Sequence, residues 1–159
     1  DHPEKVERAV ICASAARLPQ FSLMHIRSVV KLMKENVRPE LILESSLPWI
    51  YGEAFLNDKT RVQAAIKTML DNPYPQTLGA FEAQVEACEK SDLREKLRRI
   101  RAKTLVIAGR EDLITPLKCS QFIHEQIPVS KMTIIEDCGH MVQIEKPAVF
   151  CEAALSFLK

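Results

Sequence analysis

Short runs of apolar, mostly β-branched residues occur at three places in the chain and indicate buried strands. They cover residues 8–13, 104–108 and 132–135. Apolar runs without polar alternation are typical of strands that are covered on both faces, as in a parallel sheet. Between the runs, apolar residues recur every three or four positions, which predicts amphipathic helices. The pattern therefore predicts an α/β fold with three parallel strands.

The longest interval between two of these runs, residues 17–91, shows no further strand pattern. We predict four helices in this interval, over residues 20–36, 40–56, 57–70 and 76–90. Pro48 is expected to kink or split the second helix, and Asn57 or Asp58 to cap the third. The chain is thus divided into a core strand at residues 1–16, a helical insertion at 17–91 and the rest of the core at 92–159.

Three further helices are predicted from start signals in the last part of the chain. Asp92 and Glu95 have the spacing of a capping box for a helix ending near residue 100. Thr115 and Pro116 have the chemistry of an N-cap and a first helical residue, which predicts a helix to about residue 126. Pro147 starts a final helix that extends to residue 158.

The second and third apolar runs are each followed by a turn with an ionisable residue. Asp112 follows the second run and His140 the third. Right-handed crossovers bring the ends of parallel strands to the same edge of a sheet, so these two side chains are expected on neighbouring loops. The 28 residues between them leave room for one helix and one strand. The spacing is compatible with an acid and an imidazole in contact.

These two turns resemble the last third of the α/β-hydrolase fold. In that family the catalytic acid lies in a G-x-x-D-x-x-x-P turn, and the catalytic histidine in a G-H loop that is followed by E-x-P. The matching residues are Gly109, Asp112 and Pro116 in the first motif and Gly139, His140, Glu145 and Pro147 in the second. The resemblance implies that Asp112 is the acid and His140 the base of a catalytic triad, that the helical insertion is a lid, and that no cofactor is used.

The family's chain order is nucleophile, acid and histidine, so a G-x-S-x-G elbow should precede Asp112. No two of the four glycines are four positions apart, so the chain contains no such elbow. Residues 1–14 resemble the segment that follows the family's nucleophile helix. We therefore expect this chain to be the C-terminal part of a hydrolase, inactive alone, with the nucleophile upstream.

The residues present fit more than one member of the family. Asp112 and His140 could serve a serine, an aspartate or a cysteine nucleophile equally well. They are also compatible with the hydrolysis of a carbon–carbon bond. An esterase or lactonase acting on a small ester or acyl substrate is the first hypothesis. The alternative is a non-catalytic binding or interaction module that keeps the fold.

Asp137 and Glu111 are alternatives to Asp112 as the acid, but Asp137 lies in the histidine's own turn and Glu111 is one residue off the family position. Thr115 suits the cap of the next helix, which leaves Asp112 without a local role. Apolar side chains at helical spacing usually form a core, so we predict substrate contact for Trp49 and Met141 alone. The other histidines, His2, His25 and His124, are predicted to be polar surface.

Composition excludes several other functions. A net charge of +1 gives no bulk attraction to nucleic acid or anionic membranes, and the basic residues near 94–103 are predicted to be a solvated helix face. Five scattered cysteines favour buried thiols in a reducing cytoplasm over a disulfide framework. No C-x-x-C or H-x-x-x-H spacing is present, so no metal site is predicted.

In the family, strands corresponding to these three are neighbours at one end of a larger sheet. The strand at residues 8–13 would then expose an apolar edge. We expect a missing N-terminal fragment or a second chain to cover it.

Overall fold

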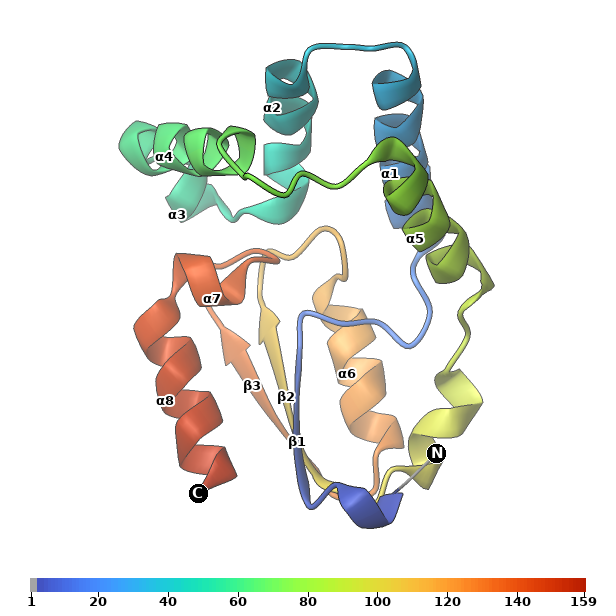
Figure 1. Cartoon of the computed structure of the whole chain (residues 1–159). Helices are drawn as coiled ribbons and strands as arrows, with labels where there is room; N and C mark the ends of the chain where they lie inside the picture. The colour runs from blue at the N-terminus through green and yellow to red at the C-terminus, as the bar shows by residue number, and fades with distance from the viewer. Residues whose placement is uncertain (1–2) are drawn as a thin grey trace.

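The computed structural model describes residues 3–159 and contains a three-stranded parallel sheet (Figure 1). Its strands are β1 (Arg8–Cys12), β2 (Lys103–Gly109) and β3 (Ser130–Ile135), in the order β1-β2-β3. Val10 pairs with Leu105, and Leu105 pairs in turn with Lys131. The predicted α/β class with three parallel strands is confirmed.

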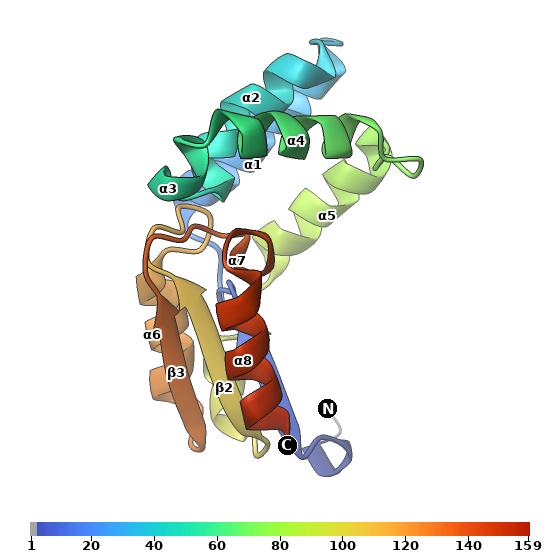
Figure 2. The same cartoon turned by 90° about the vertical axis from the view of Figure 1, so that its left-hand side faces the viewer.

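Both faces of the sheet are covered by helices, as the unbroken apolar runs predict. Side chains of β2 alternate: Leu105 and Ile107 pack toward α8 (Pro147–Leu158), whereas Val106 packs toward α6 (Leu117–Gln126) and the 3₁₀ helix η2 (Arg94–Arg99). Figure 2 shows α8 and α6 on opposite sides of the strands. Val106 and Ile107 are fully buried, so the core is centred on β2.

Five helices lie beyond the C-terminal ends of the strands and form what we call the helical layer (Figure 1). They are α1 (Gln20–Lys34), α2 (Pro39–Ile50), α3 (Glu53–Leu56), α4 (Lys59–Leu70) and α5 (Leu78–Lys90). The layer has a core of its own around Leu47, Tyr51 and Phe55, where the Tyr51 and Phe55 rings stack with centroids 4.0 Å apart. The Asp58 carboxylate caps α4 by accepting from the N–H groups of Thr60 and Arg61, as predicted.

The second predicted helix, residues 40–56, is split, but the predicted position of the split at Pro48 is wrong. Helix α2 continues through Pro48 to Ile50, and the chain leaves the helix at Tyr51, whose backbone is extended. The physical reason lies in the next residue. A Cβ on Gly52 would come within 2.6 Å of Glu111 Oε2 and 3.0 Å of the Gly139 backbone nitrogen, so packing against the core fixes the break.

Two other start signals were misassigned. The capping box at Asp92 is absent: the Asp92 carboxylate accepts from the N–H group of Arg94 and pairs with its guanidinium, and η2 is a 3₁₀ helix. Helix α6 begins at Leu117 with no side-chain cap, so Thr115 is not its N-cap. A short helix, α7 (Val142–Glu145), was not predicted, whereas α8 has the predicted ends.

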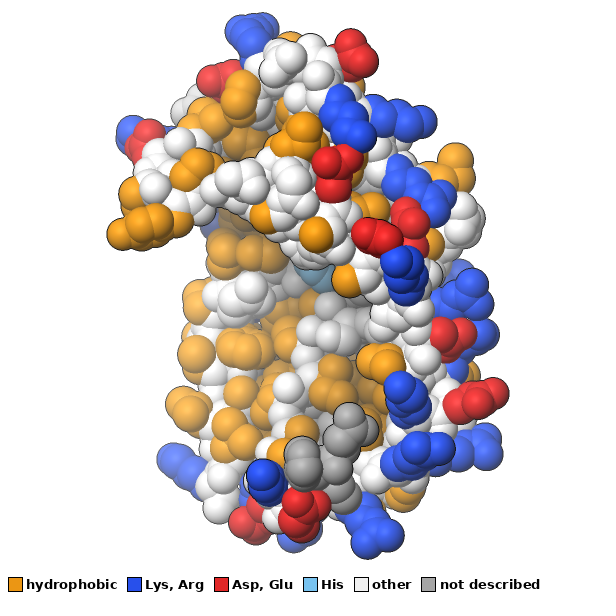
Figure 3. All heavy atoms as spheres, turned by 45° about the vertical axis from the view of Figure 1, so that its right-hand side comes forward, with side chains coloured by type: hydrophobic (Ala, Val, Ile, Leu, Met, Phe, Trp, Pro, Cys, Tyr) orange, Lys and Arg blue, Asp and Glu red, His pale blue; other side chains and the backbone are white. Residues whose placement is uncertain are grey.

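Strand β1 forms one edge of the sheet, and all five of its residues are only partly buried. Val6, just before it, is 47% exposed. Figure 3 shows apolar side chains gathered below the helical layer on this side of the molecule. Within residues 3–159, no helix is long and apolar enough to cross a membrane.

Candidate active site

The turn after β2, residues 110–116, is called the acid loop here, and the turn after β3, residues 136–141, the histidine loop. The two loops lie against each other because Gly109 has no side chain: a Cβ there would be 2.0 Å from the carbonyl oxygen of Gly139 and 2.4 Å from that of Cys138. The Glu111 N–H group also donates to the Cys138 carbonyl at 2.9 Å. The sheet edge thus joins the acid and histidine loops directly.

Asp112 is 2% exposed and its carboxylate is held by its own loop. Oδ1 accepts from the backbone N–H groups of Ile114 and Thr115, each at 2.8 Å, and Oδ2 accepts from the Thr115 hydroxyl at 2.8 Å. The expectation that Asp112 lacks a local role was therefore wrong, because Thr115 donates to the aspartate rather than capping α6. These bonds fix the direction in which Oδ2 points.

His140 completes the pair. Its Nδ1 atom is 2.8 Å from Asp112 Oδ2 and 3.4 Å from the Thr115 hydroxyl. The Asp112 side chain is fully buried and that of His140 is 27% exposed, so the imidazole lies between the carboxylate and the surface. Within residues 3–159, Nε2 has no hydrogen-bond partner. The Asp112 carboxylate thus binds Nδ1 of the imidazole, and Nε2 is left available to accept a proton.

The two alternative acids do not contact His140. Asp137 is exposed and occupies the left-handed region at φ 48°, where it makes the turn after β3. Glu111 points to the helical layer, where its Oε2 accepts from the N–H group of Glu53 at 2.7 Å.

The helical layer contacts both loops through its backbone and one hydroxyl. The Ile50 carbonyl accepts from the N–H groups of His140, at 2.8 Å, and Met141, at 3.3 Å. The buried Ser22 hydroxyl donates to the Ile114 carbonyl at 2.7 Å. Neither Ser22 nor Ile50 carries a local sequence signal, because both contacts arise only when the helical layer packs on the sheet.

Trp49 is half-buried and its ring stacks on that of His25, with centroids 4.3 Å apart, while Phe21 lies 6.4 Å away. Met141 packs against the core of the helical layer. Substrate contact by Trp49 and Met141 stays a prediction. The prediction that His25 is polar surface is wrong, because its side chain is half-buried and burial lowers its pKa. His124 is also half-buried, and its Nδ1 atom lies 2.8 Å from the Ser130 hydroxyl. His2 lies outside the described residues.

The cysteines near the pair are neutral thiols. Burial, with a smaller contribution from the Asp112 charge, raises the pKa of Cys12 to about 11. Burial and then the Glu145 charge raise the pKa of Cys138 to about 12. A raised pKa keeps a thiol protonated at neutral pH, so neither residue is an activated nucleophile. The expectation of buried thiols holds fully for Cys138 alone among the five cysteines, since three others are partly buried and Cys151 is exposed.

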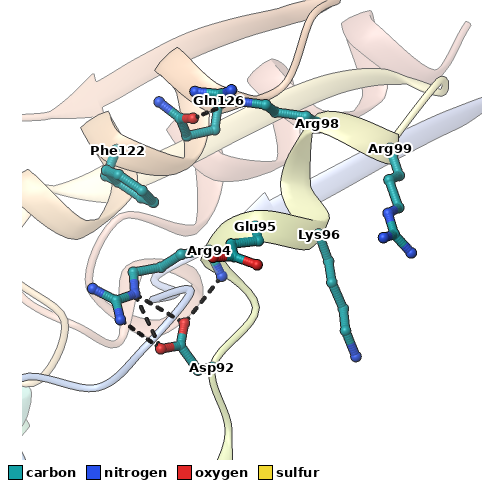
Figure 4. A pocket seen from close by; sticks show the side chains of 8 residues that line it. All are labelled: Asp92, Arg94, Glu95, Lys96, Arg98, Arg99, Phe122 and Gln126. Atoms are coloured by element: carbon teal, nitrogen blue, oxygen red, sulfur yellow. Dashed lines mark hydrogen bonds and ion pairs between the residues drawn. The ribbon is translucent and has the colours of Figure 1, made fainter.

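A hollow beside η2 and α6 is lined by charged residues (Figure 4). Arg94 is paired with Asp92, and Arg98 donates to the Gln126 side chain. The hollow adjoins the C-terminal end of α6, whereas the acid loop precedes the N-terminal end of that helix. Its exposed, internally paired charges fit the predicted solvated face. Across residues 3–159, no group of three or more His, Cys, Asp or Glu side chains could hold a metal ion.

Comparison with known proteins identifies the family. The family described as alpha/beta hydrolase fold matches residues 1–147. A putative carbamate hydrolase RutD of Caulobacter sp. (strain K31) is 33% identical over 158 residues, which are 99% of this chain and 58% of that protein. The 3-oxoadipate enol-lactonase 2 of Acinetobacter baylyi is 24% identical over 160 residues, covering 99% of this chain and 56% of that protein.

Solved structures agree with this match. An alpha/beta hydrolase enzyme from a Medee basin deep-sea metagenome library superposes with a TM-score of 0.87 at 21% identity, covering 99% of this chain and 58% of that one. The putative non-heme bromoperoxidase BpoC of Mycobacterium tuberculosis H37Rv superposes with a TM-score of 0.85 at 25% identity. The match covers 98% of this chain and 59% of that one. The chain spans a little over half the length of these relatives. It belongs to the α/β-hydrolase fold family.

Proposed function

We propose that this chain supplies the acid and the base of a nucleophile–histidine–acid triad in an acyl hydrolase of the esterase or lactonase type. The observation that carries the proposal is the 2.8 Å contact between His140 Nδ1 and Asp112 Oδ2. Names of relatives support the reaction class, since they include a pimeloyl-[acyl-carrier protein] methyl ester esterase and an enol-lactonase. The substrate would be a small ester or acyl compound.

In this mechanism Asp112 accepts the Nδ1–H hydrogen bond of His140 and so leaves the lone pair of the imidazole on Nε2. Nε2 then takes the proton of the nucleophile as it attacks the acyl carbon, and later gives it to the leaving group. The charge of Asp112 stabilises the imidazolium that forms between these two steps. The nucleophile and the oxyanion hole would come from a segment upstream of the acid loop.

The helical layer would be the lid of this site, and Trp49 and Met141 would contact the substrate. Support comes from the position of the layer at the sheet edge that bears His140, and from the bonds of Ile50 to the histidine loop. We also propose a cytoplasmic location, which the five free thiols of this chain support.

Sequencing the open reading frame upstream of Asp1, together with the intact mass of the native protein, tests the proposal. A longer chain with a nucleophile elbow before residue 1 is the expected result. A native protein of this length, with no such elbow, would favour the non-catalytic module instead.

The 159-residue chain alone is expected to have no esterase activity, because a general base without a nucleophile or oxyanion hole has nothing to activate. Hydrolysis of p-nitrophenyl acetate should equal that of the His140→Ala variant and of buffer. Clear turnover that His140→Ala abolishes would show that the nucleophile lies within these residues and has been misassigned.

We further propose that an N-terminal fragment or a second chain covers the free edge of β1. The isolated chain should therefore associate in sizing and light-scattering measurements. Val6→Lys, beside the edge, should reduce the association because a charge there opposes strand addition. Val149→Lys, on α8 with 46% exposure against 47% for Val6, is the matched control. A monomer at high concentration, with no co-purifying fragment, would contradict the proposal.

A further inference from the structure

Glu145 is a buried carboxylate between the histidine loop and the helical layer. It is the last residue of α7 and is 5% exposed. Its Oε1 accepts from the Gly139 N–H group at 3.0 Å, and its Oε2 accepts from the same group at 3.1 Å and from the Gly52 N–H group at 2.9 Å. One carboxylate thus binds the residue before His140 and the residue that links α2 to α3.

The surroundings make this interaction costly to lose. Backbone N–H groups donate to the Glu145 carboxylate and the buried Cys138 thiol lies beside it as a further donor, whereas the nearby Arg61 donates to the carbonyl oxygens of Ile144 and Glu145. A buried charge without these donors would lose solvation and gain nothing in return. Hydrogen bonds to a charged acceptor are also the stronger kind.

The two bonded segments are in direct contact. A Cβ on Gly139 would lie 2.6 Å from the Gly52 nitrogen and 2.8 Å from the Ile50 carbonyl oxygen. His140 itself donates its backbone N–H to that carbonyl. Any movement of the Ile50–Gly52 segment must therefore move the backbone that carries the imidazole.

We propose that Glu145 is a positioning residue that couples the helical layer to the base: it holds Gly52 and Gly139 together, and so keeps His140 in register with Asp112. Its effect on turnover rests on the proposed function, whereas the coupling itself can be measured without turnover. Glu111 makes a second, weaker interaction between the acid loop and the helical layer. Only its Oε2 accepts a hydrogen bond there, and the donor is the N–H group of the exposed Glu53.

Glu145→Gln is the direct test, since both oxygens of Glu145 accept hydrogen bonds. An amide has one oxygen, so its NH₂ group must replace an acceptor that faces the Gly139 N–H group 3.0 Å away. The amide oxygen is best placed at the Oε2 position, where it still accepts from Gly52, so the repulsion falls on the Gly139 N–H group. Weakening of its bonds to a charged acceptor should speed hydrogen exchange of the Gly139 amide about 10- to 100-fold. The low-field Nδ1–H proton resonance of His140 should weaken or disappear while the far-UV circular dichroism is retained.

Glu152→Gln, an exposed position on α8, is the matched control and should change neither signal. Glu111→Gln should have a smaller effect than Glu145→Gln, because its amide oxygen can still reach the Glu53 N–H group. A folded Glu145→Gln protein with an unchanged His140 resonance and unchanged Gly139 exchange would overturn the proposal. In the longer protein, Glu145→Gln should lower kcat more than it changes KM.

A measurement on the unmutated chain covers the case in which Glu145→Gln does not fold. Protection of the Gly52 amide and the His140 Nδ1–H resonance should be lost together as urea is raised below the unfolding transition. Loss of the two signals at clearly different urea concentrations would overturn the coupling. These signals also separate the two proposals: a longer protein without esterase activity but with coupled signals would reject the proposed function alone.

Discussion

On the proposed function, Asp112→Asn in a protein that also carries the nucleophile is expected to lower kcat about 10⁴-fold with little change in KM. The reason lies in the two backbone donors on Oδ1. Ile114 and Thr115 both present N–H groups there, so the amide of asparagine must place its oxygen at that position. Its NH₂ group then takes the place of Oδ2 and donates to His140 Nδ1.

That donation forces the wrong tautomer on the imidazole. With Nδ1 as acceptor, the proton moves to Nε2, which can no longer accept a proton from the nucleophile. Substrate binding needs no tautomer, so the loss should be confined to kcat. Steady-state kinetics on a p-nitrophenyl ester measures it, and the His140 ring nitrogen shifts report the tautomer independently.

Asp137→Asn is the matched control. Asp137 is exposed in the histidine loop, and asparagine tolerates its positive φ, so kcat should stay within about twofold. The same variant tests the alternative assignment of the acid. A large loss in Asp137→Asn with normal kcat in Asp112→Asn would transfer the role to Asp137. The double variant Asp112→Asn/His140→Ala should be no slower than His140→Ala alone, because the two residues act as a unit.

Features that depend on near neighbours in the chain could be predicted from the sequence. Apolar runs located β2 and β3, Pro147 marked the start of α8, and the Asp58 cap needs only the next three residues. The approach of Asp112 to His140 also followed from local patterns, because parallel topology brings the ends of neighbouring strands to one edge. The two short motifs were enough to predict that Asp112 and His140 meet, because the parallel sheet places their loops side by side.

Features that depend on distant contacts could not be predicted. The end of α2 is set by Gly52 against Gly139, and proline chemistry at Pro48 pointed to the wrong residue. Thr115 had the residue type of a cap, but Pro116 is extended with ψ 152°, so the helix starts later and the hydroxyl is free to bind Asp112. In both cases tertiary packing overrode a valid local preference.

Gly109→Ala is expected to lower the free energy of unfolding by about 3 kcal/mol or more, since overpacking against rigid backbone is at the upper end of such costs. The added methyl group would meet two carbonyl oxygens of the histidine loop at 2.0 and 2.4 Å. Neither is the end of a flexible side chain, so one of the two loops must move. Urea unfolding, monitored by circular dichroism, measures the change.

The same substitution at Gly79 is expected to have the opposite effect on the free energy of unfolding. Gly79 lies in the first turn of α5, and a Cβ there has no neighbour within 4 Å. Alanine has a higher helix propensity than glycine, so the free energy of unfolding of this variant should rise by up to about 1 kcal/mol. A loss for Gly109→Ala no larger than the gain for Gly79→Ala would mean that the loops are not packed as described.

The two variants also separate stability from alignment. If the acid and histidine loops move apart in Gly109→Ala, the His140 Nδ1–H resonance should weaken even at low urea, where the protein is still folded. Gly79→Ala should leave that resonance unchanged, because the added methyl group would meet no neighbour within 4 Å. A folded Gly109→Ala protein with an intact resonance would show that the Asp112–His140 contact survives displacement of the loop, and that the close approach at Gly109 serves stability alone.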